Sequence, residues 1–118
     1  MNIRMRFVAV ALAGILMPGA AVAHAFLQQA DPAVGATVSK APAAVTLWFS
    51  EDLEPAFSRL RVEDAAGKPV ESESARADGG VLSLPLPPLS PGRYHVFWRV
   101  VSLDAHETEG DFTFTVAP

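Results

Sequence analysis

Apolar and polar residues alternate along several short stretches of this chain, which is the pattern of β-strands with one buried face. The longest such stretch is 93–101, and the side chains on one of its faces are Tyr94, Val96, Trp98 and Val100. Residues 44–50 repeat the pattern, with one face formed by Val45, Leu47 and Phe49. These two segments are therefore expected to be strands of the domain.

The remaining strand candidates are separated by turn signals. We expect strands at 25–29, 59–63, 81–84 and 111–116, with 70–74 as a weak edge strand. Proline, glycine and aspartate mark the turns, at Asp31-Pro32, Gly67, 78–80 and the proline-rich link 86–92. No segment has the spacing of a long amphipathic helix. About seven short strands predict an all-β domain: a Greek-key antiparallel β-sandwich or partly closed barrel.

The first 23 residues have the pattern of a secretory signal peptide. Arg4 and Arg6 precede an apolar run at 7–17, and the small residues that a signal peptidase recognises follow at 21–23, Ala-Val-Ala. The apolar run is too short to cross a bilayer core of about 30 Å as a helix. We therefore expect residues 1–23 to be a cleaved leader and residues 24–118 to be the exported domain.

Two cleavage sites compete at the end of this leader. A cut after Ala23 makes His24 the first residue of the mature protein. The overlapping pattern Ala23-His24-Ala25 would instead leave Phe26 at the front and remove His24. We favour the first site because it lies at a more usual distance from the Pro-Gly break at 18–19.

Charge and cysteine content narrow the possible functions. Without the leader the chain keeps seven Lys and Arg against thirteen Asp and Glu, a net charge of −6. It has no basic patch, which argues against nucleic acid and anionic membrane as partners, and no further apolar run that could span a membrane. The absence of cysteine excludes disulfides and thiolate metal sites. So small a domain must be held by its core, by a bound metal, or by both.

Asp104 and His106 follow the long strand and form a candidate metal site. In an extended chain residues two apart point the same way, so this carboxylate and this imidazole are expected to converge just past the strand end. As the mature N-terminus, His24 would add its α-amine and its imidazole Nδ1, which chelate a metal together. Singly, each residue has a plainer interpretation: a turn cap for Asp104, a solvated loop histidine for His106, an incidental neighbour of the cleavage site for His24.

This donor set favours one Cu(II) ion per chain. Three nitrogens and one oxygen without sulfur suit a tetragonal cupric ion, and Cu(II) has the highest affinity among the divalent metals. The amine has an unperturbed pKa near 7.7–8.0, so losing its proton costs little at neutral pH. The three methionines, at positions 1, 5 and 17, all lie in the expected leader. No methionine site for Cu(I) is therefore expected.

Six segments in a fixed order carry a family resemblance. They are His-Ala-Phe-Leu at 24–27, Asp-Pro at 31–32, Leu-Trp-Phe-Ser-Glu at 47–51, Pro-Gly-Arg-Tyr at 91–94, Trp-Arg-Val-Val-Ser-Leu-Asp-Ala-His at 98–106, and Gly-Asp-Phe-Thr-Phe at 110–114. In these segments the chain resembles the CopC family of periplasmic copper-binding proteins. The likeness covers essentially all of residues 24–118, and 98–106 is its most specific part.

The resemblance implies a cupredoxin-like (immunoglobulin-like) β-sandwich that holds Cu(II) through His24, Asp104 and His106. It also implies a periplasmic location, a role in copper resistance or homeostasis, and an inner-membrane copper transporter of the CopD type as a partner. Some family members have a methionine-rich Cu(I) site, and this chain lacks the methionines for one. Glu51 lies where some relatives have an acidic residue near the cupric site, and we expect only an outer role for it.

Three functions compete for this sequence. The first is a non-catalytic Cu(II) carrier or buffer. The second is an enzyme, a copper monooxygenase with an N-terminal histidine brace. Against it, Asp104 would occupy the position that oxygen needs, and a domain this small leaves little room for a substrate-binding face. The third is a metal-free immunoglobulin-like adhesion or chaperone module. We expect the carrier, and no catalytic residues.

Overall fold

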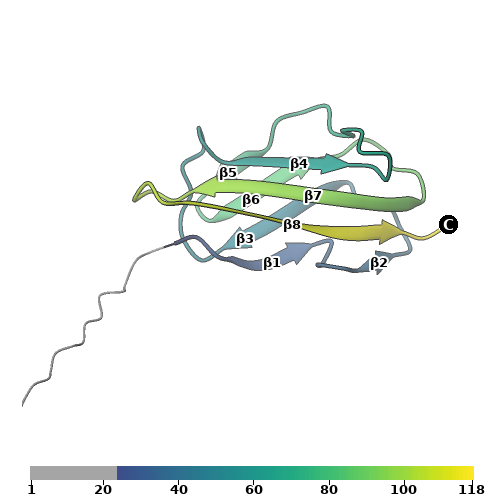
Figure 1. The fold of residues 1–118 in the computed structure, drawn as a ribbon, viewed down its shortest axis with the longest axis horizontal. Helices are drawn as coiled ribbons and strands as arrows, with labels where there is room; N and C mark the ends of the chain where they lie inside the picture. The colour runs from purple at the N-terminus through teal and green to yellow at the C-terminus, as the bar shows by residue number, and fades with distance from the viewer. Residues whose placement is uncertain (1–23) are drawn as a thin grey trace, which may run out of the picture.

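A computed structural model describes residues 24–118 as a sandwich of two four-stranded β-sheets (Figure 1). The strands are β1 (Leu27–Asp31), β2 (Thr37–Val38), β3 (Ala44–Phe49), β4 (Arg59–Glu63), β5 (Arg76–Asp78), β6 (Val81–Pro85), β7 (Gly92–Val101) and β8 (Glu107–Val116). The first sheet has the strand order β1-β3-β6-β5, and the second has the order β2-β8-β7-β4. This confirms the predicted all-β sandwich, with eight strands where about seven were expected.

The expected leader, residues 1–23, lies outside the described part of the chain. Among residues 24–118 the structure has no helix of the length and apolarity needed to cross a membrane. Every strand pairing is antiparallel except that of the short strand β2 with β8.

Alternate side chains of both sheets fill the core between them. In β3 the buried residues are the three that the alternating pattern indicated, Val45, Leu47 and Phe49. The other strands add Leu60, Val62, Leu82, Leu84, Tyr94, Val96, Val100, Phe112, Phe114 and Val116. Since burial of apolar surface is the main favourable term in folding, this shared layer holds the two sheets face to face without a disulfide.

Two of the predicted strands lie elsewhere. The first strand runs over Leu27–Asp31 instead of 25–29, because its ladder with β3 is irregular at Leu27 and residues 24–26 are held by side chains. The weak edge strand at 70–74 is wrong. Val70 and Glu71 make only single hydrogen bonds to Val62, and the strand that forms is β5, which pairs with β6 across the glycine turn at 79–80.

The pairing of β7 with β8 is the longest in the fold and ends beside the candidate site. It has ten residue pairs, from Gly92↔Val116 to Val101↔Glu107. β8 thus begins four residues before the predicted start at 111. Two of these four extra residues are outward-facing acids: Glu107 and Glu109 contact Arg99 at 2.7 and 3.2 Å. These exposed carboxylates hid the strand from a search for apolar alternation.

Gly110 leaves room for a tryptophan near the end of this ladder. Trp98 lies opposite Gly110 and packs edge-on against Phe49, with the ring centroids 5.1 Å apart. A Cβ at position 110 would lie 2.5 Å from an indole carbon, closer than real Cβ contacts. The glycine is therefore a packing requirement of the tryptophan, and the indole covers the edge of the core as expected.

Candidate metal centre

A tight turn between β7 and β8 carries Asp104 and His106. The backbone N–H of Ser102 donates to the His106 carbonyl at 2.9 Å, and the N–H of Ala105 donates to the Ser102 carbonyl at 2.8 Å. Ala105 has a φ of 71°, in the left-handed region. The prediction of an extended segment here is therefore wrong. The two side chains still converge, because the turn brings Asp104 Oδ1 to 3.2 Å from His106 Nδ1.

Ser102 supports this turn from the inside. Its side chain is buried, and the hydroxyl donates to Asp104 Oδ1 while its oxygen lies 3.3 Å from the backbone nitrogen of His106. The hydrogen bond from Ser102 has the largest effect and lowers the pKa of Asp104; desolvation opposes it, and His106 lowers the pKa further. The carboxylate at this position is therefore ionised at neutral pH and available as an oxygen ligand.

Residues 24–26 run beside this turn and are anchored to both sheets. Ala25 is fully buried, and its carbonyl accepts a hydrogen bond from the Thr108 hydroxyl at 2.8 Å. On the other side the backbone N–H of Phe26 donates to the Ser50 hydroxyl at 2.8 Å, and the N–H of Ser50 donates to the Phe26 carbonyl at 2.9 Å. Residues 24–26 are thus part of the sandwich at the β7–β8 turn.

The three predicted ligand residues therefore lie together, although His24 and Asp104 are eighty positions apart. The rings of His24 and His106 are 4.9 Å apart between centroids and tilted by 49°. One ion could lie between a nitrogen of each ring, since metal–nitrogen bonds are about 2 Å long. The Asp104–His106 separation of 3.2 Å similarly suits neighbouring ligands of one ion.

The three side chains meet in pairs rather than as a closed cage. Within residues 24–118 no group of three His, Cys, Asp or Glu side chains is already arranged to hold a metal ion. The predicted donor set includes a further atom, the α-amine of His24, which is a peptide nitrogen while Ala23 precedes it. Nitrogen and carboxylate donors of this kind fit Cu(II), and a modest side-chain rearrangement would have to close the site.

Acidic and apolar side chains surround the candidate centre. A hollow of about 330 Å³ beside it is lined by Ser50, Glu51, Asp52, Leu103 and Asp104. Glu51 and Asp104 line the same hollow, and the outer role of Glu51 stays a prediction. The aromatic ring of Phe26 and the side chain of Leu103 are largely exposed at the same end. The surface around the site is therefore negative with apolar positions beside it.

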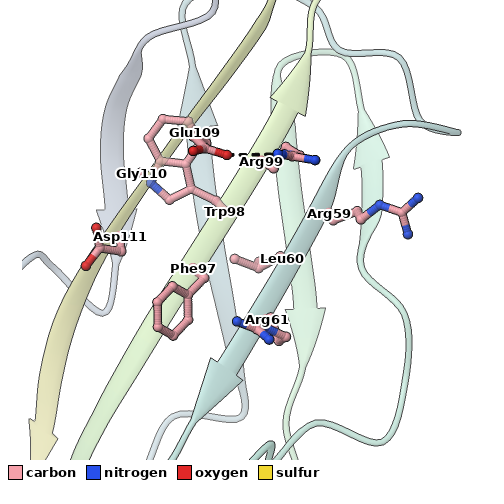
Figure 2. Close-up of a pocket in the computed structure, with 9 residues that line it drawn as sticks. All are labelled: Arg59, Leu60, Arg61, Phe97, Trp98, Arg99, Glu109, Gly110 and Asp111. Atoms are coloured by element: carbon pink, nitrogen blue, oxygen red, sulfur yellow. Dashed lines mark hydrogen bonds and ion pairs between the residues drawn. The ribbon is translucent and has the colours of Figure 1, made fainter. Parts of the chain in front are cut away.

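A second hollow lies on the outer face of the β4-β7-β8 sheet and contains none of the predicted ligands (Figure 2). It measures about 580 Å³, and Arg61 stacks over the Phe97 ring there with its guanidinium 4.8 Å from the ring centroid. Along the same face His95 contacts Asp111 at 2.6 Å. His95 therefore lies at the surface, hydrogen-bonded to Asp111.

The sequence did not predict that hydroxyl side chains support the candidate centre. Ser102 lies inside the distinctive 98–106 segment, but nothing in the pattern said that it would bond Asp104. Ser50 and Thr108 give no local signal, because their partners are 24 and 83 positions away. Contacts of this kind depend on the tertiary arrangement alone.

The fold and the centre together define a class of protein: a small all-β sandwich with a histidine–aspartate cluster at one end, where the N-terminal segment meets the β7–β8 turn. The family model described as the CopC domain matches residues 27–117. The chain belongs to the CopC family. It is 36% identical to copper resistance protein C of Pseudomonas syringae pv. tomato over 122 residues, covering 96% of each chain. It is also 41% identical to protein YobA of Escherichia coli K12 over 98 residues, covering 80% of this chain and 79% of YobA.

Solved structures agree with this family membership. CopC of Methylosinus trichosporium OB3b superposes with a TM-score of 0.76 at 39% identity, covering 80% of this chain and 95% of that one. PcoC of Escherichia coli, described as a methionine-rich copper resistance protein, superposes with a TM-score of 0.69 at 35% identity, covering 80% of this chain and 99% of PcoC. Residues 24–118 therefore have the CopC fold.

Proposed function

We propose that this protein binds one Cu(II) ion outside the inner membrane and acts as a copper carrier or buffer in copper resistance or homeostasis. The ligands are the α-amine and imidazole of His24, a carboxylate oxygen of Asp104 and the imidazole of His106. The observation that carries the proposal is the meeting of His24 with the Asp104–His106 pair, with 4.9 Å between the two imidazole rings. Membership of the CopC family supports copper as the metal.

The oxidation state follows from the chemistry of the donors. Amine, imidazole and carboxylate groups are harder ligands than the thioether and thiolate groups that Cu(I) prefers. Residues 24–118 contain no methionine and no cysteine. These residues therefore lack the methionines in which PcoC is described as rich, and they offer Cu(I) no thioether or thiolate donor. Uptake and release of copper as Cu(II) is the function that these residues support.

The proposal requires cleavage after Ala23, and the packing of Ala25 supports that choice. A cut after Ala25 would remove a side chain that is fully buried and a carbonyl that accepts the Thr108 hydroxyl. It would also leave Phe26 with a charged amine where its N–H now donates to Ser50. A cut after Ala23 leaves all of these contacts intact. Export through residues 1–23 then delivers the protein to the periplasm.

A carrier fits this site better than an enzyme. If Asp104 binds the copper, its carboxylate would occupy a coordination position that a brace monooxygenase needs for oxygen. The exposed acidic and apolar surface around the centre suits brief docking of a protein that exchanges copper, such as an inner-membrane transporter of the CopD type.

Cu(II) titration of the mature protein tests the proposal. Protein that begins at His24, with its mass verified intact, should take up one Cu(II) tightly in competition with a chelator. An otherwise identical protein with one Gly ahead of His24 should bind far more weakly, because its amine is blocked, while its β-sheet spectrum stays the same. Equal affinities would show that the amine is not a ligand.

Two further measurements separate the competing functions. Wild-type protein loaded with copper should show no ascorbate-dependent oxidase turnover, and turnover would favour the monooxygenase. The Asp104→Ala variant, which would free the coordination position assigned to Asp104, serves as the positive comparison. Absence of stoichiometric Cu(II) uptake would favour the metal-free adhesion or chaperone module instead.

A further inference from the structure

We infer that two hydroxyl side chains, those of Thr108 and Ser50, form a clamp that positions His24 for the metal. The inference rests on the proposed function, since it concerns how that same site is assembled. Neither residue is a metal ligand. Each acts through the backbone of residues 24–26, on opposite sides of that segment.

Thr108 holds the segment from the side of β8. Its hydroxyl donates to the carbonyl of Ala25 at 2.8 Å, and the contact is half-buried. Thr108 lies on the inward face at the start of β8, two residues after His106. The strand that follows one ligand therefore also fixes the residue that follows another ligand. The start of β8 therefore positions both His106 and the residue next to His24, and so sets the distance between the two histidines.

Ser50 holds the segment from the side of β3. Its hydroxyl accepts a hydrogen bond from the N–H of Phe26 at 2.8 Å, and its oxygen lies 3.2 Å from the carbonyl of His24. Its own backbone N–H donates to the Phe26 carbonyl at 2.9 Å. Ser50 therefore contacts the residue that bears the proposed ligands through a backbone atom outside the proposed ligand set.

A clamp matters here because chain ends are otherwise mobile. The first residues of a domain are poorly ordered unless something ties them down, and ordering each backbone residue costs conformational entropy. In this protein the contacts to Ala25 and Phe26 already order the segment next to His24. They leave the His24 amine and imidazole free for the metal. Most of the ordering therefore precedes metal binding, and this raises affinity.

The experiment compares Cu(II) dissociation constants of mature variants that begin at His24. Thr108→Val keeps the shape of the side chain and removes the hydroxyl. We expect it to weaken Cu(II) binding by roughly tenfold or more, the range found when groups that orient metal ligands are lost. Thr108→Ser, which restores a hydroxyl, should recover most of the affinity. Thr113→Val is the matched control on the same strand, and it should bind Cu(II) like the wild type.

Two readouts distinguish positioning from a general loss of structure. Thermal unfolding of the metal-free variants reports on the fold, and electron paramagnetic resonance of the Cu(II) complex reports on its ligands. At saturating copper, Thr108→Val should give the spectrum of the wild type, because the same atoms bind once the segment is placed. Ser50→Ala provides a second, independent variant, with the same expected direction, should Thr108→Val fail to fold.

The outcomes separate this inference from the function on which it rests. Wild-type protein that takes up no Cu(II) would refute the proposed function, and the clamp with it. Wild-type protein that binds Cu(II) while Thr108→Val and Ser50→Ala bind it equally well would refute the clamp alone. An equal loss of affinity in Thr113→Val would also refute it, since the effect would then belong to β8 as a whole.

Discussion

Replacement of Ser102 by alanine isolates the support of the Asp104–His106 turn from the metal ligands themselves. The serine is almost completely buried, at 1% exposure, and its hydroxyl donates to Asp104 Oδ1. Its oxygen also lies 3.3 Å from the backbone nitrogen of His106. The substitution removes one oxygen atom and changes no proposed ligand. A loss of Cu(II) affinity would therefore report on ligand orientation.

The magnitude follows from the two roles of the hydroxyl. Loss of a group that orients a metal ligand typically costs 10–100-fold in affinity, or about 1.4–2.8 kcal/mol. The cost to folding should lie near the lower end of the roughly 1–3 kcal/mol for an unpaired buried polar group, since water can reach the half-exposed Asp104. We thus expect the free energy of copper binding to weaken by more than the free energy of unfolding of the metal-free protein.

Ionisation does not account for this expected loss at neutral pH. The Ser102 hydrogen bond lowers the pKa of Asp104, so its removal raises that pKa toward the ordinary value near 3.9. At pH 7 the carboxylate is ionised in both proteins. The difference in affinity should therefore persist unchanged between pH 7 and pH 8, as expected for an effect of orientation.

The assay is a competition titration with a Cu(II) chelator, beside urea unfolding of the metal-free proteins. Ser58→Ala is the matched control: Ser58 is also buried, and its hydroxyl oxygen lies 3.3 Å from the Val101 nitrogen, away from the ligands. It should lose stability and keep its affinity for Cu(II). If Ser102→Ala binds Cu(II) as tightly as Ser58→Ala does, the reasoning about the turn is wrong.

Three further predictions concern packing, pH and metal removal. Gly110→Ala should destabilise the fold by about 1–3 kcal/mol, because the new Cβ would lie 2.5 Å from the Trp98 ring, and an unchanged urea midpoint would contradict this packing. Cu(II) binding should weaken as the pH falls from 7 to 5, because protons compete with the metal for nitrogen ligands. The pKa of Asp104 is lowered, so its carboxylate stays ionised over this pH range. The contribution of this carboxylate to stability is present above its ordinary pKa and is lost only below it. A Cu(II) affinity that falls only below pH 4 would therefore point to the carboxylate alone. Copper at 100 times its dissociation constant should raise the free energy of unfolding by about 2.7 kcal/mol, and a chelator should reverse this increase. The His106→Ala variant should lack the increase. Equal melting temperatures with and without copper would argue against a site in the folded protein.

The alternating pattern of the sequence determined most of the fold. Strands with a regular apolar face, such as β3 with Val45, Leu47 and Phe49, lie where the period of two indicated. The pattern failed where one face carries charge: β8 begins at Glu107, and its first outward side chains are acids paired with Arg99. It also failed for β2 and β5, which are too short to show a period and form through pairing with longer neighbours.

For the site, the sequence supplied the residue types and the tertiary structure supplied their proximity. Aspartate at 104 and histidine at 106 are visible as a pair in the linear sequence, and the order of the family segments pointed to His24. Only the folded chain decides that residues 24–26 lie beside the β7–β8 turn, since that depends on the burial of Ala25 and on hydroxyl contacts across 24 and 83 positions. The local sequence sets the alternation of side chains along each strand and their chemistry. Contacts between distant residues arise only when both sheets pack around one core.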